Sequence, residues 1–565
     1  MISQTGYPSV DKPWLKYYDS ASKQGNLNIS IYDFWHNFAK KRYDATVINY
    51  CGNNISNRIM DEKIIAVARS LSSIGVKSGD IISVCTINIP EVAYLLYGAS
   101  VLGAVVDLFD PRTNEDGVKK YLNVSNSKYM FVLDDLINIT QYTVGSAVQY
   151  IVHISPYESL AKGKKIIASV NRKKVYCKNK KAIFISWKEF IKNGYLKDIK
   201  RVTASNCKDE VVAIVHTGGT TGVPKGVKLT NGNFIAEYYN YKALDFDYKS
   251  GDVFLNILVP WVAYGMVFGF FVVYCLDFKT ALIPVFSPEM ITKLVLKYKP
   301  AQVLGIPAYY EQLLNDKRLI GKDLSFIKCL GSGGDSISIQ KEELFNKFLQ
   351  EHNSNSKFVK GYGMTELSSS VCTCTQSVNK LGSVGIPLIN NTIAIFDSET
   401  YEEKKYGEIG EVCICSPTMM KGYDCEENNH TVMKQHADGK VWIHSGDVGY
   451  MDTDGCLFIV DRIKRMIIRK GFKVYPSEIE KVVMKVSQID SCVVVAKEHT
   501  DDVHTPFIFI VLKEENVDVF DEVFERLERE LPGYEVPYET DIKIIKKIPH
   551  TKLGKVDYKK LETMV

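Results

Sequence analysis

Residues 62–109 alternate between helical and strand periodicity, and this alternation limits the fold more than any other feature of the chain. The segment EKIIAVARSLSSIG (62–75) places four apolar residues on one face of a helix, namely Ile64, Val67, Ala68 and Leu71. It is followed by a strand-like run IISVC (81–85), a helical run PEVAYLLYGASVLGA (90–104) and a second strand-like run VVDLF (105–109). Strands that alternate with helices in this way predict a mostly parallel sheet in an α/β fold.

A second set of such segments lies between residues 301 and 366. It consists of AQVLGIP, AYYEQLLN, FIKCLGSGG and SKFVKGYGMTE, which we interpret as strand, helix, strand and strand. The last two strands end in glycines. Because open α/β sheets bind ligands at the carboxyl ends of their strands, we expect a binding site there.

The pattern of predicted secondary structure changes twice after this second set. From about residue 385 to 460 the short runs TIAIFDSET, GEVCICS and GCLFIVD indicate a β-rich subdomain. The final hundred residues begin with the amphipathic helix PSEIEKVVMKV (476–486) and continue with CVVVAKE, FIFIVLKE, a charged helix near 518–531 and DIKIIKKI. At 565 residues the chain is too long for one core, so we expect a large N-terminal domain of two α/β subdomains plus a β-rich subdomain, followed by a small α+β domain.

The loop HTGGTTGVPKG (216–226) follows the apolar run VVAIV and holds four glycines, three threonines and a lysine. Bare backbone N–H groups and hydroxyls suit an anion. The loop is not the P-loop of nucleotide kinases, because Gly226 stands where that pattern requires Ser or Thr, and VKLT continues as a strand. The alternative is a glycine-rich connection between two hairpin strands.

Composition sets limits on the partners. A formal charge of +4 is nearly balanced for this length, so no nucleic-acid partner is implied. Between Lys162 and Lys181 there are nine lysines or arginines and no acidic residue, which indicates a solvated excursion or, alternatively, a site that meets anionic lipid or a carrier protein.

Cysteine usage and hydropathy point to a cytoplasmic protein. The thirteen cysteines do not form a small-protein disulfide framework, and the start MISQTGYPSVDKPW has no apolar signal core. The pairs Cys372/Cys374 and Cys413/Cys415 lack the spacing of a zinc site and favour ordinary buried cysteine. The longest apolar runs, 92–106 and 267–276, are shorter than the roughly 20 residues of a membrane-spanning helix.

Four further motifs follow the glycine-rich loop in order. They are GYGMTE (361–366), SGD (445–447), DRIKRMIIRKGFKVYPSEIE (461–480) and PHTKLGKVD (549–557). Together with the loop they resemble the adenylate-forming superfamily, which includes acyl-CoA synthetases, aryl-CoA ligases, luciferases and peptide-synthetase adenylation domains. The resemblance covers nearly the whole chain.

The resemblance implies that the protein activates a carboxylic acid with ATP and Mg²⁺, forming an acyl adenylate and pyrophosphate. Because the acid and the triphosphate repel each other, the site must supply positive charge and oriented donors. The resemblance assigns the β- and γ-phosphates to the hydroxyls, backbone and ammonium of the loop residues Thr217, Gly218, Gly219, Thr220, Thr221, Gly222 and Lys225.

The nucleotide contacts follow in the same way. By resemblance, Glu366 holds Mg²⁺, Thr365 contacts the α-phosphate, and Tyr362, followed by Gly363, stacks on adenine. The backbone of GSGGD (331–335), including Gly333 and Asp335, borders the base, while Asp447 accepts both ribose hydroxyls and Arg462 makes a second ribose contact. Without the motif order, Tyr362 would be interpreted as a core aromatic residue and Glu366 as a surface charge.

The C-terminal lysine motif implies a mobile domain. Lys555 matches the family's lysine that bridges the acid's carboxylate and the α-phosphate, and the family's hinge falls on Lys464. The predicted domains are therefore residues 1–463 and a mobile lid of residues 464–565. After the swing, KGFKV (470–474) reaches the site, where Gly471 lets a pantetheine arm pass close to the backbone.

The identity of the acid and of the thiol is less constrained. The stretch 259–275 contains no acidic residue, so an apolar acyl or aryl tail fits better than an amino acid. The TGGTTG form of the loop and the GFKVYPSEIE form of the hinge segment resemble fatty acyl-CoA synthetases more than luciferases, so we expect a fatty or other apolar acyl substrate. Many relatives have a histidine after the proline–aromatic pair, where this chain has Val262 and Ala263. The thiol belongs to CoA or, alternatively, to the phosphopantetheine of an acyl carrier protein. A non-catalytic nucleotide-binding relative is the third reading, which the presence of Lys225, Glu366, Asp447, Arg462 and Lys555 disfavours.

Overall fold

The computed structural model describes residues 5–19, 22, 24–165, 175–195, 198–199, 207–217, 225–499, 503–514, 517–550 and 556–565. It divides into two compact units. The large unit comprises Trp14–Thr392 and Cys415–Ile443, and the small unit comprises Met1–Pro13, Ile393–Ile414 and His444–Val565. The predicted boundary between residues 463 and 464 concerns a hinge for motion and stays a prediction.

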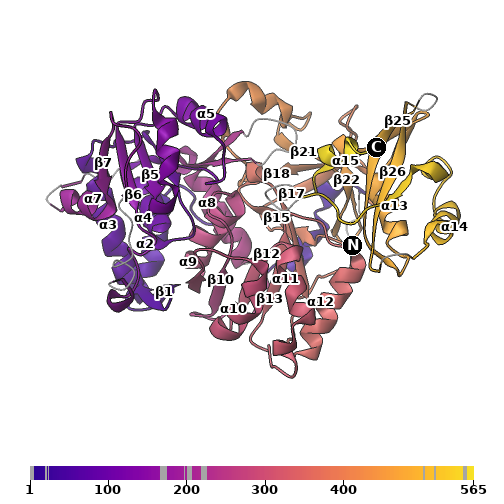
Figure 1. Ribbon diagram of the computed structural model, residues 1–565, viewed down its shortest axis with the longest axis horizontal. Coiled ribbons are helices and arrows are strands. Elements are labelled where there is room, and N and C mark those ends of the chain that lie inside the picture. The colour runs from indigo at the N-terminus through magenta and orange to yellow at the C-terminus, as the bar shows by residue number, and fades with distance from the viewer. Residues whose placement is uncertain are drawn as a thin grey trace. The chain divides into compact units, whose positions relative to one another are not determined.

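The first sheet of the large unit has eight strands. In sheet order they are β19 (Gly422–Tyr423), β9 (Gly226–Thr230), β8 (Val211–His216), β4 (Val105–Leu108), β3 (Ile81–Cys85), β5 (Tyr129–Leu133), β6 (Tyr150–Ile154) and β7 (Ile183–Ser186). The strands from β8 to β7 pair in parallel, whereas β9 and β19 join antiparallel. Helices α3 (Asn57–Ser73), α4 (Pro90–Leu102) and α7 (Trp187–Gly194) pack alongside (Figure 1). The predicted parallel α/β arrangement is confirmed.

The second sheet of the large unit has nine strands. In sheet order they are β16 (Ile386–Pro387), β15 (Ser370–Thr373), β14 (Phe358–Gly363), β13 (Cys329–Gly333), β12 (Gln302–Gly305), β10 (Val253–Asn256), β11 (Lys279–Leu282), β1 (Thr46–Tyr50) and β2 (Asn53–Ser56). The strands from β14 to β1 are parallel. Its helices include α10 (Ile291–Tyr298), α11 (Pro307–Asn315) and α12 (Ile339–Glu351).

A shared apolar core connects the two sheets of the large unit. Every residue of α4 is buried, because the helix contributes to a core that also contains Val84 of β3 and Phe254 of β10. A helix that is apolar on all sides is stable only in such a position. Helices α2 (Ile31–Ala39) and α8 (Asn231–Lys242) complete this layer.

The aromatic stretch 264–275 is helical, and most of it is a π-helix. The segment η5 (Tyr264–Val272) has π geometry and continues into α9 (Val273–Cys275). Two of its carbonyl oxygens accept side-chain donors: Asn256 Nδ2 donates to Gly269 O (2.9 Å), and Tyr97 Oη donates to Phe270 O (3.0 Å). Polar side chains that enter a helix in this way widen its turns.

The small unit holds the C-terminal α+β structure. Its sheet order is β24 (Phe472–Val474), β23 (Ile467–Arg469), β26 (Val503–Leu512) and β25 (Ile489–His499), with β27 (Ile542–Ile544) parallel to β26. Helices α13 (Pro476–Val483) and α14 (Phe520–Glu530) bury Ile479, Val483 and Val523 in its core. The α+β prediction for the last hundred residues is confirmed.

The β-rich segment forms a further sheet. Residues 393–414 and 444–462 of this segment belong to the small unit, and residues 415–443 belong to the large unit. The strands of the sheet are β17 (Thr392–Phe396), β18 (Gly410–Cys415), β20 (Met433–Gln435), β21 (Val441–Met451) and β22 (Leu457–Arg462). Within the small unit, β21 pairs antiparallel with β22 and brings Asp447 opposite Arg462. Among the described residues, no helix combines the length and the hydropathy required to cross a bilayer.

Candidate active site

The glycine-rich loop joins the antiparallel strands β8 and β9. The two residues that flank its apex close it, because Thr217 N donates to Lys225 O (2.9 Å) and Lys225 N donates to Thr217 Oγ1 (3.2 Å). Gly218, Gly219, Thr220, Thr221 and Gly222 lie outside the described residues. The hairpin connection that the sequence left open as an alternative therefore describes the base of the loop, at Thr217 and Lys225.

The side chains of Lys225 and Glu366 both contact Tyr423. The Tyr423 hydroxyl donates to Glu366 Oε1 (2.7 Å), and Lys225 Nζ lies 4.7 Å from the centroid of the same ring. Tyr423 is almost fully buried because β19 pairs with β9. Burial, together with the neighbouring Glu366 carboxylate, raises the pKa of Tyr423, so its hydroxyl stays a donor. This arrangement places a cation and a carboxylate beside the glycine-rich loop.

Glu366 has the chemistry of a magnesium ligand. It is half-buried and lies in a 3₁₀ turn, η8 (Thr365–Leu367), that Met420 N stabilises by donating to Glu366 O (2.8 Å). Hard cations such as Mg²⁺ prefer carboxylate oxygen. Because the Tyr423 hydroxyl holds one carboxylate oxygen in place, the other is oriented by the same contact.

The predicted adenine residues lie at the carboxyl ends of β13 and β14. These strands are parallel neighbours, and Gly333 pairs in register with Gly361, next to Tyr362. Asp335 is exposed and accepts a hydrogen bond from Ser336 N (2.9 Å). A side chain at Gly363 would overlap the Ser369 carbonyl, because β14 and β15 approach closely at a bulge. The large unit thus brings Gly333, Asp335, Tyr362, Gly363, Thr365 and Glu366 to one sheet edge.

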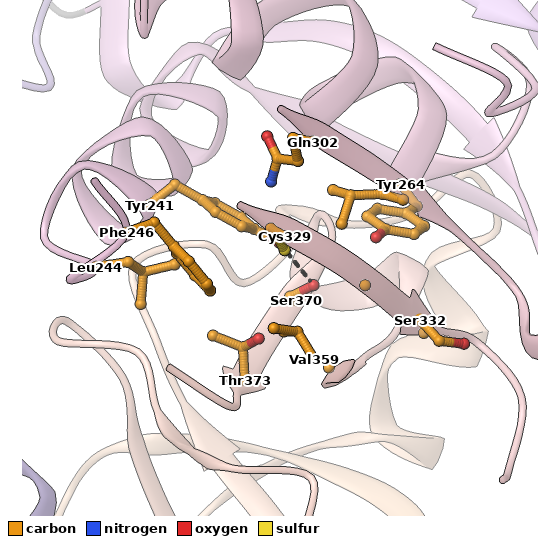
Figure 2. Close-up of a pocket in the computed structure, with 14 residues that line it drawn as sticks. Tyr241, Leu244, Phe246, Tyr264, Gln302, Cys329, Ser332, Val359, Ser370 and Thr373 are labelled. Carbon is orange, nitrogen blue, oxygen red and sulfur yellow. Dashed lines mark hydrogen bonds between the residues drawn. The ribbon is translucent and has the colours of Figure 1, made fainter. Parts of the chain in front are cut away.

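A small pocket extends from this edge along the face of the sheet (Figure 2). Side chains on alternate positions of a strand share a face, and the pocket floor follows that rule on three strands. Its volume, about 20 Å³, is room for one or two water molecules. The lining residues are Gln302, Leu304, Cys329, Gly331, Ser332, Gly333, Val359, Gly361, Ser370 and Thr373 of the strands, with Tyr241, Leu244, Phe246 and Tyr264 from the covering segments.

A buried carboxyl group lies behind the pocket wall. Glu237 of α8 accepts hydrogen bonds from Ser370 N (3.1 Å) and Asn240 Nδ2 (3.2 Å). Burial raises its pKa to about 8, and the hydrogen bonds oppose that rise. The Tyr241 hydroxyl donates to Ser370 Oγ (2.9 Å), which connects the same strand to the pocket.

The predicted ribose residues form an ion pair in the small unit. Arg462 Nε lies 2.9 Å from Asp447 Oδ1, and the Asp447 side chain is largely buried while that of Arg462 is exposed. Lys464 is exposed in the 3₁₀ turn η10 (Ile463–Arg465), and Gly471, with φ +85°, links β23 to β24. Lys555 lies outside the described residues.

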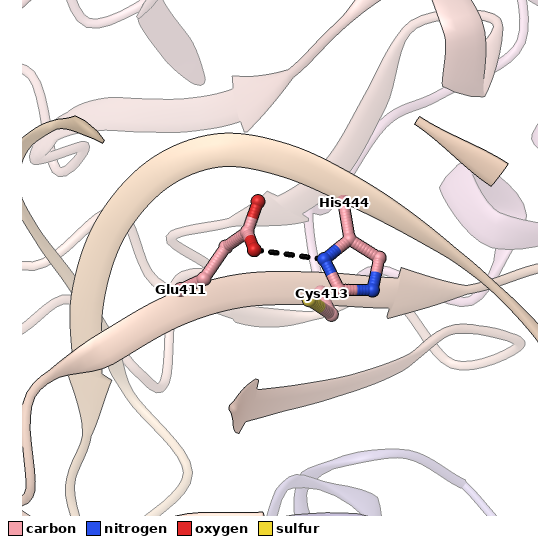
Figure 3. A group of neighbouring side chains, drawn as sticks. All are labelled: Glu411, Cys413 and His444. Carbon is pink, nitrogen blue, oxygen red and sulfur yellow. Dashed lines mark hydrogen bonds and ion pairs between the residues drawn. The ribbon is translucent and has the colours of Figure 1, made fainter. Parts of the chain in front are cut away.

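Glu411 holds the backbone that precedes Asp447 and also contacts His444, as Figure 3 shows for the second contact. Its carboxylate accepts hydrogen bonds from Gly446 N (3.0 Å) and from the ring of His444, where Nδ1 lies 2.7 Å away. Cys413 completes a buried cluster whose ligand atoms lie within 4.8 Å of one another. Because both carboxylate oxygens already accept these hydrogen bonds, we interpret the cluster as a support for the SGD turn rather than as a metal site.

Sequence reasoning missed Tyr423, Gln302 and Glu411. Tyr423 occurs in the short run MKGYD, whose only local signal is a Gly–Tyr pair. Gln302 begins β12, and its place in the pocket depends on the register of β12 with β13. Glu411 could have been identified from the sequence. It is a charged residue in the otherwise apolar strand GEVCICS, and a charged residue requires a polar partner when it is buried.

Comparison with known proteins gives a consistent result. The family model for AMP-binding enzyme matches residues 34–424, and that for the AMP-binding enzyme C-terminal domain matches residues 478–555. The long-chain-fatty-acid–CoA ligase of Bacillus subtilis is 28% identical over 552 residues, covering 96% of each chain. The 4-coumarate–CoA ligase of Pinus taeda is 26% identical over 487 residues, covering 83% of this chain and 82% of its own.

Solved structures show the same fold. The anthranilate CoA ligase AuaEII, in complex with anthranoyl-AMP, aligns with a TM-score of 0.79 and 18% identity, covering 96% of this chain and 98% of its own. ATP-bound MatB from Rhodopseudomonas palustris aligns with a TM-score of 0.78 and 20% identity, covering 96% and 99%. Since the first family model alone matches more than half of the residues, the chain belongs to the adenylate-forming family of AMP-binding enzymes.

Proposed function

We propose that the protein is an acid–CoA ligase that activates a carboxylic acid with an apolar acyl or aryl group. In the first step a carboxylate oxygen bonds to the α-phosphorus of ATP, the bond to the β-phosphate breaks, and pyrophosphate leaves with the electron pair. In the second step the thiol sulfur of CoA bonds to the acyl carbon, the thiol gives up its proton, and AMP leaves.

The observation that carries this proposal is the contact series from Lys225 through Tyr423 to Glu366. Lys225 would neutralise phosphate charge, and Glu366, oriented by the Tyr423 hydroxyl, would hold Mg²⁺. Bound Mg²⁺ would supply further positive charge for the developing pyrophosphate. The loop donors from Thr217 to Gly222 complete the cradle, and Thr365 contacts the α-phosphate.

The small unit supplies the remaining roles in the proposal. Asp447 and Arg462 hold the ribose, and Lys555 bridges the acid and the α-phosphate during adenylation. A rotation of residues 464–565 about Lys464 then replaces Lys555 with the segment at Gly471, which admits the pantetheine arm. The domains of the catalytic cycle are therefore residues 1–463 and 464–565.

Loading of an acyl carrier protein is the alternative second step. The basic stretch 162–181 is the segment that would then contact an acidic carrier, but two of its lysines bind within the chain. Lys164 Nζ donates to Cys51 O (2.8 Å), and Lys165 Nζ lies 2.8 Å from Glu158 Oε2. Free CoA is therefore the preferred acceptor.

Pyrophosphate exchange tests the proposal. Purified protein, ATP, Mg²⁺ and a panel of acids should return labelled pyrophosphate into ATP, and the Lys225→Ala variant should lose this exchange by about 10²- to 10³-fold. Lys242→Ala is the control, because Lys242 lies at the end of α8 and has no role in the proposal. Repeating the assay with CoA or a holo-carrier protein as acceptor separates the two second steps. No exchange with any acid would favour a nucleotide-binding relative without catalysis.

A further inference from the structure

The residues that line the pocket of Figure 2 extend along β13 from Gly333 to Cys329, and we interpret the two ends as a mouth and a closed end. Its mouth is the pair Gly333 and Gly361 at the carboxyl ends of β13 and β14, next to Tyr362. Its closed end is the pair Gln302 and Cys329 at the amino ends of β12 and β13. Four residue steps separate Cys329 from Gly333, a span of about 13 Å along the strand.

The pocket does not continue past its closed end. Cys329 has no exposed surface and Gln302 is 3% exposed, and both adjoin the packed core. An acid whose carboxylate lies at the mouth must therefore end near Gln302. A long unbranched acyl chain would have to displace core residues, which are packed at crystal-like density.

The closed end is polar. The side-chain oxygen of Gln302, Oε1, is buried and accepts no hydrogen bond from the described residues. In Figure 2 the Gln302 amide lies between Tyr241 and Tyr264, which line the same pocket. The Gln302 side chain also hydrogen-bonds to the Cys329 thiol, so only its oxygen lacks a partner among the described residues. Buried polar groups are normally paired, so an unpaired amide oxygen at the end of a pocket indicates a ligand with a hydrogen-bond donor.

The closed end is also uncharged. No Asp, Glu, Lys or Arg lines the pocket. Burial raises the pKa of the Cys329 thiol to about 12, so it remains neutral. An ammonium or a second carboxylate there would have no partner of opposite charge, whereas a hydroxyl can both donate to and accept from an amide.

The walls suit a flat group. Tyr241, Phe246 and Tyr264 present aromatic rings, and Gly331 leaves the floor without a side chain between Leu304 and Val359. Offset or edge contacts between rings stabilise an aromatic ligand in such a slot. Because the pocket is small, a ring enters only when Leu244 and Phe246 move aside, and both lie on the connection between α8 and β10.

From these four observations we infer that the substrate is an aromatic carboxylic acid with an uncharged hydrogen-bonding group, such as a phenolic hydroxyl, at the end remote from its carboxylate. Gln302 is the residue that determines this specificity. The inference rests on the proposed function, because that function makes this pocket the site of the acid.

The test compares matched acids on the full-length protein. In pyrophosphate exchange, 4-hydroxycinnamate should exceed cinnamate by at least about tenfold in kcat/KM, because a site built to hydrogen-bond a hydroxyl rejects the analogue without it. Palmitate should be poorer than both. A preference for palmitate, or equal values for the two ring acids, would overturn the inference without the need for any variant.

The Gln302→Met variant keeps the length of the side chain and removes its polar end. It should bring the ratio of 4-hydroxycinnamate to cinnamate close to one, mainly through KM, while the control Gln435→Met, at an exposed position, should leave the ratio unchanged. An unchanged ratio in a Gln302→Met protein that melts like the wild type would contradict the role of Gln302.

A binding measurement separates this inference from the proposed function. Isothermal titration of the wild type with 4-hydroxycinnamate and with cinnamate needs no adenylation. Selective binding of the hydroxylated acid without any exchange would support the pocket assignment and overturn the proposed reaction. Pyrophosphate exchange that is faster with palmitate than with the two ring acids would support the proposed acid activation and overturn the assignment of the pocket to an aromatic acid.

Discussion

The hydroxyl of Tyr423 donates a 2.7 Å hydrogen bond to Oε1 of Glu366. The two residues are far apart in the sequence, and the contact depends on the pairing of β19 with β9, the strand that follows the glycine-rich loop. The loop and the carboxylate therefore share one support. If that support orients Glu366, its removal should weaken metal-dependent chemistry more than it weakens the fold.

We predict that Tyr423→Phe lowers the apparent affinity for Mg²⁺ by about 10- to 100-fold, the range typical of residues that orient a metal ligand. The ring that packs under Lys225 is retained, so ATP affinity at saturating Mg²⁺ should change little. Pyrophosphate exchange measured over a range of Mg²⁺ concentrations checks this. Tyr195→Phe, at an exposed tyrosine, is the control, and an unchanged Mg²⁺ dependence would show that Glu366 needs no such support.

Local patterns predicted much of what surrounds this contact. Strand periodicity and terminal glycines located β8, β13 and β14, because those signals lie within a few residues of the site. Tyr423 and Gln302 could not be found in this way. The role of each depends on strand pairing between distant segments, and pairing register is a tertiary property that a single sequence does not encode locally. The π geometry of η5 was missed for the same reason, since Asn256 and Tyr97 approach it from other elements.

Glu237 should make stability depend on pH. Its pKa is about 8 in the folded protein, above the ordinary value near 4.5, so the folded state holds a proton that the unfolded chain releases. This contribution to stability is complete below pH 4.5 and is lost as the pH rises toward 8, with a slope of about 1.4 kcal/mol per pH unit.

We predict that Glu237→Gln removes this slope, because the amide stays neutral at every pH. Unfolding by urea at intervals from pH 5 to pH 8 measures it. Glu91, whose pKa burial raises to about 7, contributes in the same direction, so Glu91→Gln should also flatten the curve and the double variant should be flattest. Identical curves for Glu237→Gln and the wild type would mean that Glu237 is ionised when folded.

Glu411→Ala should loosen the SGD turn. The variant leaves the Gly446 N–H and the His444 ring without their acceptor in a buried setting, at a cost of about 1 to 3 kcal/mol for each group. Hydrogen exchange of the peptide that contains residues 441–451 should become at least about tenfold faster. Glu408→Ala, at an exposed residue three positions earlier, should leave that peptide unchanged, and equal protection in both variants would rule out the support.

Lys555→Ala should separate the two half-reactions. A lysine that bridges the acid and the α-phosphate acts only in adenylation, so exchange should fall by about 10²- to 10³-fold while a supplied acyl adenylate still reacts with CoA. Lys560→Ala, on the following helix α15 (Tyr558–Glu562), is the matched control. Equal loss of both half-reactions would refute the assignment of Lys555.

Lys464→Pro should give the opposite pattern. Proline fixes the backbone angle φ and restricts the preceding residue, Ile463, so it limits rotation at this 3₁₀ turn. The Lys464 side chain is exposed, and among the described residues its backbone N–H donates no hydrogen bond, so the substitution removes no contact of the resting fold. We therefore expect pyrophosphate exchange to persist while thioester formation from a supplied adenylate is lost, as measured by release of AMP.

The control is Lys464→Ala, in which the backbone angle φ is not fixed by a ring, so both adenylation and thioester formation should be retained. Thioester formation at the wild-type rate in Lys464→Pro would place the hinge elsewhere.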